Sequence, residues 1–320
     1  MKMLSGAKWR YVLVLGAVAI IVIAGVLTYV YTERKEKEKT AGLILFLKGE
    51  KHNIYVDSET LQMINSSDPG GSPLLEVLMK PLYNATFADA VARKFLNEPV
   101  RGSGSVFEYH EKNDTMKRVL VDQAYTITYI NDEYTSAIIP KEQVLSNETL
   151  INLSYSIIQR FRGDYSDLRV EIIQTPKLII VNGSSGKEEL IGYGGQLVVF
   201  RQYINGVPVM GFHGTVKISF GPGGVLQSYM DFTVPCENVS QRGETVRSVR
   251  SVFQDIADGG TTLEGRDLRV VSWTLCFMTT YLPQIERRNG ESHGVAVMKY
   301  MVKLAPLRGS GVYVEYFSAY

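Results

Sequence analysis

The sequence contains few of the residues from which catalytic and metal sites are usually built. Only four histidines occur in 320 residues, and no two have the i, i+4 spacing of a helical zinc-protease motif. A G-x-S-x-G segment, which would expose a nucleophilic serine on a sharp turn, is also absent. His213 lies between Gly211 and Gly214, but a lone histidine at a strand end is usually solvated or hydrogen-bonded locally. The sequence therefore predicts a protein that is not an enzyme, with no catalytic, metal or cofactor-binding residues.

Clusters of like charge are lacking as well. The formal net charge is +1, because 34 lysines and arginines are balanced by 33 acidic residues. Strong binding to a phosphate backbone requires clustered basic residues, and here they are dispersed among acids, so no nucleic-acid partner is predicted. The hydrophobic fraction of 45% and the charged fraction of 21% are typical of a globular chain.

One long apolar run is present near the N-terminus. Residues 11–31 contain no charged side chain, and about 20 apolar residues are enough for a helix to cross a bilayer. We therefore expect a transmembrane anchor over 11–31, preceded by a short cytoplasmic segment over 1–10 and followed by a charged stalk over 32–40. A cleavable signal peptide and a buried core helix are the alternatives; the apolar region of a signal peptide is usually shorter.

Glycosylation acceptor triplets indicate on which side of a membrane the remaining chain would lie. Seven Asn-X-Ser/Thr triplets occur, more than ordinary composition would give by chance. This density favours an extracytoplasmic C-terminal domain and a single-pass protein of the cell membrane with a cytoplasmic N-terminus. The candidate acceptors are Asn65, Asn84, Asn113, Asn147, Asn152, Asn182 and Asn238.

The two cysteines are compatible with the same compartment. An even number of widely spaced cysteines in an oxidising space allows one disulfide, so a bridge between Cys236 and Cys276 is a candidate. The alternative is that both are buried thiols that pack as small apolar residues.

The apolar periodicity predicts an α+β fold in which helices pack on antiparallel sheets. Proline at a first helical position predicts a short helix from Pro73 to Pro81, and helical apolar spacing predicts further helices after Thr86, after Ser146 and from Glu244 to Asp258. The intervening segments are rich in strand-like apolar runs. We expect an N-terminal α+β domain over 41–145 and a C-terminal α+β region over 146–320.

The segment from Phe200 to Pro235 predicts a three-stranded meander. Asn205-Gly206 between two apolar runs is a strong signal for a two-residue hairpin turn, because a type I′ turn needs positive φ at both central residues. Around this turn, Gln202 to Gly211 resembles PepSY-like modules, including the propeptides of thermolysin- and fungalysin-type proteases. The element order from Ser146 to Phe317 is similar to the tandem arrangement of YycH- and YycI-type membrane-anchored regulators.

This resemblance implies a noncatalytic module that inhibits, chaperones or tunes another protein of the cell envelope. Because proline cannot donate a hydrogen bond to a central strand, Pro208 predicts that its strand lies at an edge or a bulge. An edge strand can accept a partner strand, so Val207, Pro208 and Val209 are the candidate partner-binding residues. The alternative function is a structural or adhesion component of a glycosylated cell surface.

Overall fold

The structure is a computed structural model that describes residues 42–102, 106–181, 183, 186–280, 284–288, 290–307 and 310–320. These residues form nineteen β-strands and four α-helices. The fold is therefore mostly β, and the predicted α+β class with tandem helix-on-sheet units is wrong. The prediction gave too much weight to helices, because long-range strand pairing, which local periodicity does not report, makes a strand of residues 73–81, which were expected to be helical.

The predicted membrane segment, residues 11–31, lies outside the described residues, as do the flanking segments 1–10 and 32–40. Within the part of the chain that is described, no helix is long and apolar enough to cross a membrane. This finding does not support the predicted N-terminal membrane anchor or the predicted single-pass localisation in the cell membrane. Both predictions are corrected accordingly.

The described chain divides into two compact units, neither of which is continuous in sequence. The larger unit contains residues 72–246, 275–300 and 318–320, and the smaller unit contains residues up to 71 together with 247–274 and 301–317. The division does not follow the predicted boundary between 145 and 146. The reason is that β7 pairs with β14 through Ile130 and Ser228, which joins strands from both sides of that boundary into one sheet.

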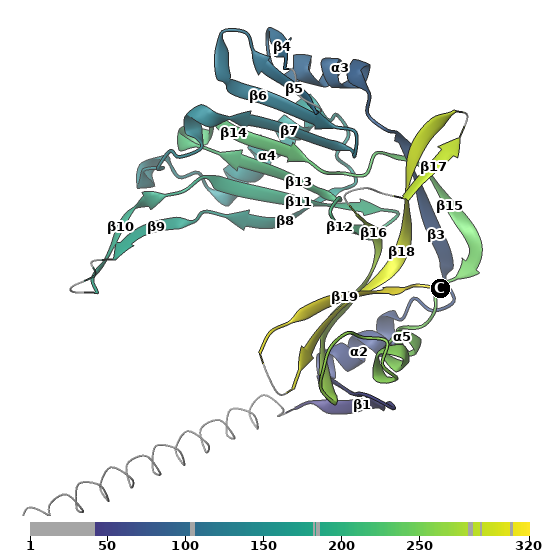
Figure 1. Cartoon of the computed structure of the whole chain (residues 1–320). Helices are drawn as coiled ribbons and strands as arrows, with labels where there is room; N and C mark the ends of the chain where they lie inside the picture. Colours follow the sequence, from purple (N-terminus) through teal and green to yellow (C-terminus); the bar gives the residue numbers. More distant parts are fainter. Residues whose placement is uncertain are drawn as a thin grey trace, which may run out of the picture. The chain divides into compact units, whose positions relative to one another are not determined.

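An eight-stranded antiparallel sheet forms the main layer of the larger unit (Figure 1). Its spatial order is β4-β5-β6-β7-β14-β13-β11-β8. The strands are β4 (Pro99–Arg101), β5 (Phe107–Glu111), β6 (Asp114–Asp122), β7 (Thr126–Asn131), β14 (Leu226–Asp231), β13 (Thr215–Phe220), β11 (Gln196–Ile204) and β8 (Leu168–Gln174).

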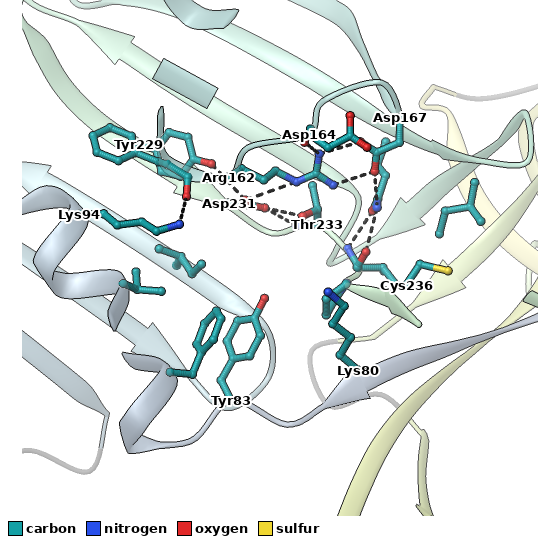
Figure 2. A pocket seen from close by; sticks show the side chains of 18 of the residues that line it. Lys80, Tyr83, Lys94, Arg162, Asp164, Asp167, Tyr229, Asp231, Thr233 and Cys236 are labelled. Atoms are coloured by element: carbon teal, nitrogen blue, oxygen red, sulfur yellow. Dashed lines mark hydrogen bonds and ion pairs between the residues drawn. The ribbon is translucent and has the colours of Figure 1, made fainter. Parts of the chain in front are cut away.

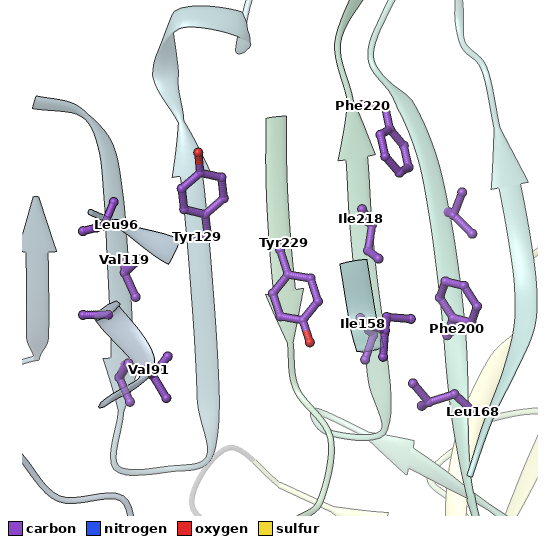
Figure 3. Packing of buried hydrophobic residues seen from close by; sticks show 14 of the residues in the cluster. Val91, Leu96, Val119, Tyr129, Ile158, Leu168, Phe200, Ile218, Phe220 and Tyr229 are labelled. Atoms are coloured by element: carbon purple, nitrogen blue, oxygen red, sulfur yellow. The ribbon is translucent and has the colours of Figure 1, made fainter. Parts of the chain in front are cut away.

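Two helices pack on one face of this sheet. The side chain of Asn84 accepts a hydrogen bond from the Phe87 amide at the start of α3 (Ala85–Phe95), and Ser146 caps α4 (Asn147–Phe161) in the same way. Such caps satisfy amide groups that have no partner inside the helix. Figure 3 shows the core between helices and sheet, in which Val91 of α3 lies on the side of Val119 and Ile158 of α4 lies on the side of Ile218 and Phe200.

The remaining strands of the larger unit pair mainly around β3. β3 (Pro73–Pro81) lies between β15 (Cys236–Thr245) and β18 (Glu291–Pro306), and β18 also pairs with β17 (Gln284–Arg288). The predicted helix over 73–81 is therefore wrong. Leu74, Val77 and Leu78 are all buried, a spacing that imitates a helical face.

Two shorter pairings complete this unit. β12 (Val207–Gly211) pairs with β11 across the Asn205-Gly206 turn, where both residues have positive φ as predicted. β9 (Lys177–Val181) and β10 (Glu188–Tyr193) form a separate two-stranded ribbon. Single 3₁₀ turns occur at Asp132–Tyr134, Lys141–Gln143 and Pro222–Gly224.

The smaller unit combines short strands with two helices. β1 (Ile44–Lys48) pairs with β2 (Asn53–Val56), and β2 pairs in parallel with the beginning of β16 (Asp267–Thr279). The helices are α2 (Ser58–Ser67) and α5 (Val249–Ala257), and the last strand is β19 (Tyr313–Ser318). The helix predicted from Glu244 to Asp258 corresponds to the shorter α5, whose Val249, Phe253 and Ile256 side chains are buried.

Candidate functional site

The candidate site is a cavity of about 630 Å³ in the larger unit. Its lining comes from α3, the end of α4 and the loop that follows, the ends of β11 and β14, and the segment that leads into β15. Cavities of a few hundred cubic ångströms with an apolar lining and a few polar groups are typical of ligand sites. The cavity is therefore the first place to look for function.

One wall of the cavity is aromatic. The rings of Tyr83 and Phe87 stack with centroids 4.0 Å apart, and those of Phe95 and Phe161 stack at 3.8 Å. Tyr229 approaches Phe161 edge to face at 5.7 Å. Each of these residues lines the cavity. The helical spacing of Phe87, Val91 and Phe95 on α3 places their side chains on the same side of the helix, which is why one short helix supplies much of this wall.

The opposite end is polar and is organised by Arg162. The guanidinium donates two parallel hydrogen bonds to Asp167, from Nη1 to Oδ1 at 2.6 Å and from Nη2 to Oδ2 at 2.7 Å (Figure 2). Gln202 Nε2 donates to the same carboxylate at 2.9 Å. Burial alone lowers the Arg162 pKa, but the bonds to Asp167 and the charge of Asp231 outweigh burial and raise it. Arg162 is therefore permanently charged and held in place.

Asp231 is the buried carboxylate of the polar end. Its Oδ1 accepts hydrogen bonds from the Thr233 amide at 2.9 Å and from the Thr233 hydroxyl at 2.6 Å, and its Oδ2 accepts from the Tyr229 hydroxyl at 3.1 Å. Arg162 Nε lies 3.9 Å from Oδ2. Three neutral donors thus stabilise this charge, while the nearby guanidinium is committed to Asp167.

The Tyr83 hydroxyl points into the cavity beneath Asp231 (Figure 2). Burial, followed by the charge of Asp231, raises the Tyr83 pKa well above its ordinary value. The same two causes raise the Tyr229 pKa. Among the described residues, no hydrogen-bond partner is found for the Tyr83 hydroxyl. A neutral hydroxyl that faces a cavity in this way can donate a hydrogen bond to a ligand and also accept one.

Lysines and a cysteine lie around the rest of the cavity. Lys94 Nζ donates to the Phe161 carbonyl at the end of α4 at 2.9 Å, and Lys80 is exposed. Burial raises the pKa of the Cys236 thiol. Nucleophilic cysteines need a depressed pKa, so Cys236 is not prepared for attack. The described residues also contain no group of three or more metal-ligating side chains.

Six of the seven candidate glycosylation sites are exposed. They are Asn65, Asn84, Asn113, Asn147, Asn152 and Asn238; Asn182 lies outside the described residues. Asn84 has a structural role as well, since its Oδ1 caps α3. Exposure makes these side chains accessible, and their modification stays a prediction.

The predicted disulfide is not present. Cys236 and Cys276 are not joined in the structure. Cys236 lies at the start of β15 and lines the cavity, whereas the buried Cys276 donates from Sγ to the Lys299 carbonyl at 3.5 Å. Both cysteines are in strands, but different neighbours surround them.

The strand proposed for partner binding is not a fully open edge. β12 pairs with β11 at Val207 and Pro208, and on its other side it pairs in parallel with β16 from Val209 to Gly211. Val209 is buried. The chain itself therefore occupies the edge that was predicted to accept a partner. His213 is also buried, and its Nε2 lies 2.6 Å from the Ala124 carbonyl oxygen.

Sequence reasoning did not find the cavity residues. Arg162 and Asp167 lie five residues apart in the loop after α4, but Asp231 belongs to the distant β14, so no motif connects the three. The one available signal was the density of aromatic residues on α3 and α4, and such stripes usually indicate an ordinary core.

Comparisons with known proteins do not assign a family. No family model matches the chain, and no curated protein matches it. A solved structure of an uncharacterized protein from Eubacterium rectale is similar with 11% identity and a TM-score of 0.43, covering 86% of this chain and 89% of that chain.

Proposed function

We propose that the protein is a noncatalytic binding module that takes up a side chain of another protein in the cavity lined by Tyr83 and Asp231. The observation that carries this proposal is the chemistry of the cavity lining. Aromatic rings form one wall, and Arg162, Asp167 and the buried Asp231 are already hydrogen-bonded to one another or to neighbouring residues. Such a preformed site, apolar on one side and polar on the other, is prepared to bind a ligand.

The surface around the cavity supports a protein as the ligand. Lys80, Lys94 and Asp164 line the cavity and are exposed. Protein interfaces commonly combine an aromatic, desolvated centre with a polar, solvent-accessible rim. A purely structural or adhesive role, the alternative predicted from the sequence, does not require a cavity of this kind.

Photo-crosslinking from the cavity tests the proposal. A photoreactive amino acid replaces Ala90, an exposed residue of α3 that lines the cavity, in the full-length protein in its native cells. The matched control places the same group at Met116, which is exposed on β6 and does not line the cavity. We expect a discrete protein adduct from position 90 only, and its loss when Phe161→Ala shortens the aromatic wall. The same adducts from both positions, or none from position 90, would contradict the proposal.

A further inference from the structure

We infer that the side chain that enters the cavity is a lysine, with its alkyl part along the aromatic wall and its ammonium group between Asp231 and the Tyr83 hydroxyl. This inference rests on the proposed function and specifies the chemistry of the partner.

The charges of the polar end favour a cation. Asp164, Asp167 and Asp231 contribute three carboxylates, and among the described residues Arg162 is the one basic side chain that joins them in hydrogen bonds or ion pairs. Because Arg162 forms its two short bonds with Asp167 and approaches Asp231 only to 3.9 Å, the charge of Asp231 is incompletely neutralised. A carboxylate that is 6% exposed attracts an entering cation strongly, because little water screens it.

The hydrogen-bonding groups also match an ammonium. An ammonium group has three donors and no acceptor. Asp231 Oδ2 receives only the 3.1 Å bond from Tyr229 and the distant Arg162 Nε, so it retains capacity to accept. The Tyr83 oxygen can accept another of the hydrogen bonds that the ammonium group donates. The raised Tyr83 pKa keeps this hydroxyl neutral, so it adds no charge of its own.

The aromatic wall suits the rest of a lysine. A lysine buries its methylene chain on apolar surface while its charged end remains in a polar environment, and the faces of tyrosine and phenylalanine rings attract cations. Lys94, which also lines the cavity, is held at the Phe161 carbonyl, and Lys80 is exposed at the rim. An anionic side chain would instead be placed beside Asp231 and Asp164.

Two uncharged-backbone probes of matched shape test the inference. N-acetyl-lysine amide and N-acetyl-norleucine amide share the alkyl chain and differ in the ammonium group. NMR titration of the full-length protein should show the lysine probe binding at least about tenfold more tightly, as expected for a charge-assisted hydrogen bond. Asp231→Asn should remove this preference. Asp132→Asn, at a carboxylate paired with Arg118 and not lining the cavity, should leave it unchanged.

Each other outcome overturns the inference. Equal or tighter binding of the norleucine probe would show that the cavity selects apolar side chains, which leaves the proposed function standing. Tighter binding of N-acetyl-glutamate amide would reverse the charge preference. Binding of no probe would also refute the inference, while photo-crosslinking from position 90 decides the proposed function separately. If Asp231→Asn unfolds, as judged by circular dichroism, Tyr83→Phe is the second variant, and an undiminished affinity for the lysine probe in that variant would count against the inference.

Discussion

Arg162 links the end of α4 to the nearby Asp167 and to Asp231 at the end of β14. It donates to Asp167 and approaches Asp231, and its side chain is 20% exposed. A charge in this position is stabilising only while its partners remain. The residue that organises the cavity is therefore also one that the fold depends on.

We predict that Arg162→Met destabilises the protein by about 2–4 kcal/mol, because two carboxylates then lose their cation. Arg160→Met is the matched control. Arg160 lies two residues earlier and contacts the Phe161 ring from the exposed side, with Cζ 5.1 Å from the ring centroid, so its replacement should cost less than about 1 kcal/mol. Urea unfolding measures both, and equal losses would show that the network is not stabilising.

We predict that the wild type loses stability more steeply than Tyr109→Phe as the pH rises into the alkaline range. Burial, together with its hydrogen bond to Asp89, raises the Tyr109 pKa to about 12. In the unfolded chain tyrosine ionises near pH 10. Between these values the unfolded state loses a proton that the folded state keeps, so the stabilisation is complete below pH 10 and decreases as the pH rises toward 12. Urea unfolding from pH 9 to 11 should therefore show a steeper loss for the wild type than for Tyr109→Phe. Parallel curves would contradict this reading.

At the scale of elements, sequence patterns predicted what local interactions determine. Ser146 and the apolar spacing after it predicted α4, and Asn205-Gly206 predicted the hairpin between β11 and β12. The same reasoning failed for β3, where Leu74, Val77 and Leu78 are buried because β15 and β18 flank the strand. A strand with neighbours on both sides and buried residues on both faces loses the alternation that identifies strands.

The site was less predictable than the elements. Its acids and aromatic residues acquire their roles only when β14, β11 and the end of α4 come together, and no local pattern contains that information. The open edge predicted at Pro208 and the disulfide predicted from the two cysteines are not present. Both predictions depended on distances that spacing alone cannot supply.

Two glycines next to β12 provide a test of local backbone constraint. Gly214 has φ +92°, and a Cβ there would lie 2.4 Å from the Val209 carbonyl oxygen. Gly206 has φ +79° with nothing within 4 Å of such a Cβ. Both alanine variants introduce strain from positive φ, roughly 1–2 kcal/mol. Gly214→Ala should lower the free energy of unfolding by at least about 2 kcal/mol more than Gly206→Ala, because the Val209 backbone must also move. Thermal unfolding of both variants measures the difference, and similar midpoints would refute it.

At the scale of the whole molecule, each unit is assembled from distant parts of the chain. The eight-stranded sheet needs β4 to β7 from before residue 145 and β8, β11, β13 and β14 from after it. The core likewise combines Ala88 and Val91 with Phe200 and Ile218. The eight-stranded sheet and its core can therefore form only when both parts of the chain are present.

We therefore predict that a fragment of residues 146–320 does not fold by itself. β14 would lose its neighbour β7, and the α3 side of the core would be missing. An exposed strand edge beside an uncovered apolar face also favours aggregation. Circular dichroism and denaturant titration of the fragment should show no cooperative transition. A cooperative transition with dispersed NMR signals would mean that the predicted boundary at 145/146 separates independent domains after all.

Cys236 reports most directly whether a ligand occupies the cavity that we propose as the binding site. Cys236 lines the cavity, whereas Cys276 is buried. Alkylation of the native protein at pH 8.5, followed by mass spectrometry, gives the rate for each thiol. Saturating N-acetyl-lysine amide should slow the modification of Cys236 severalfold, and N-acetyl-norleucine amide should slow it much less. An unchanged Cys236 rate at a concentration where the lysine probe is bound would place the probe elsewhere and contradict the account.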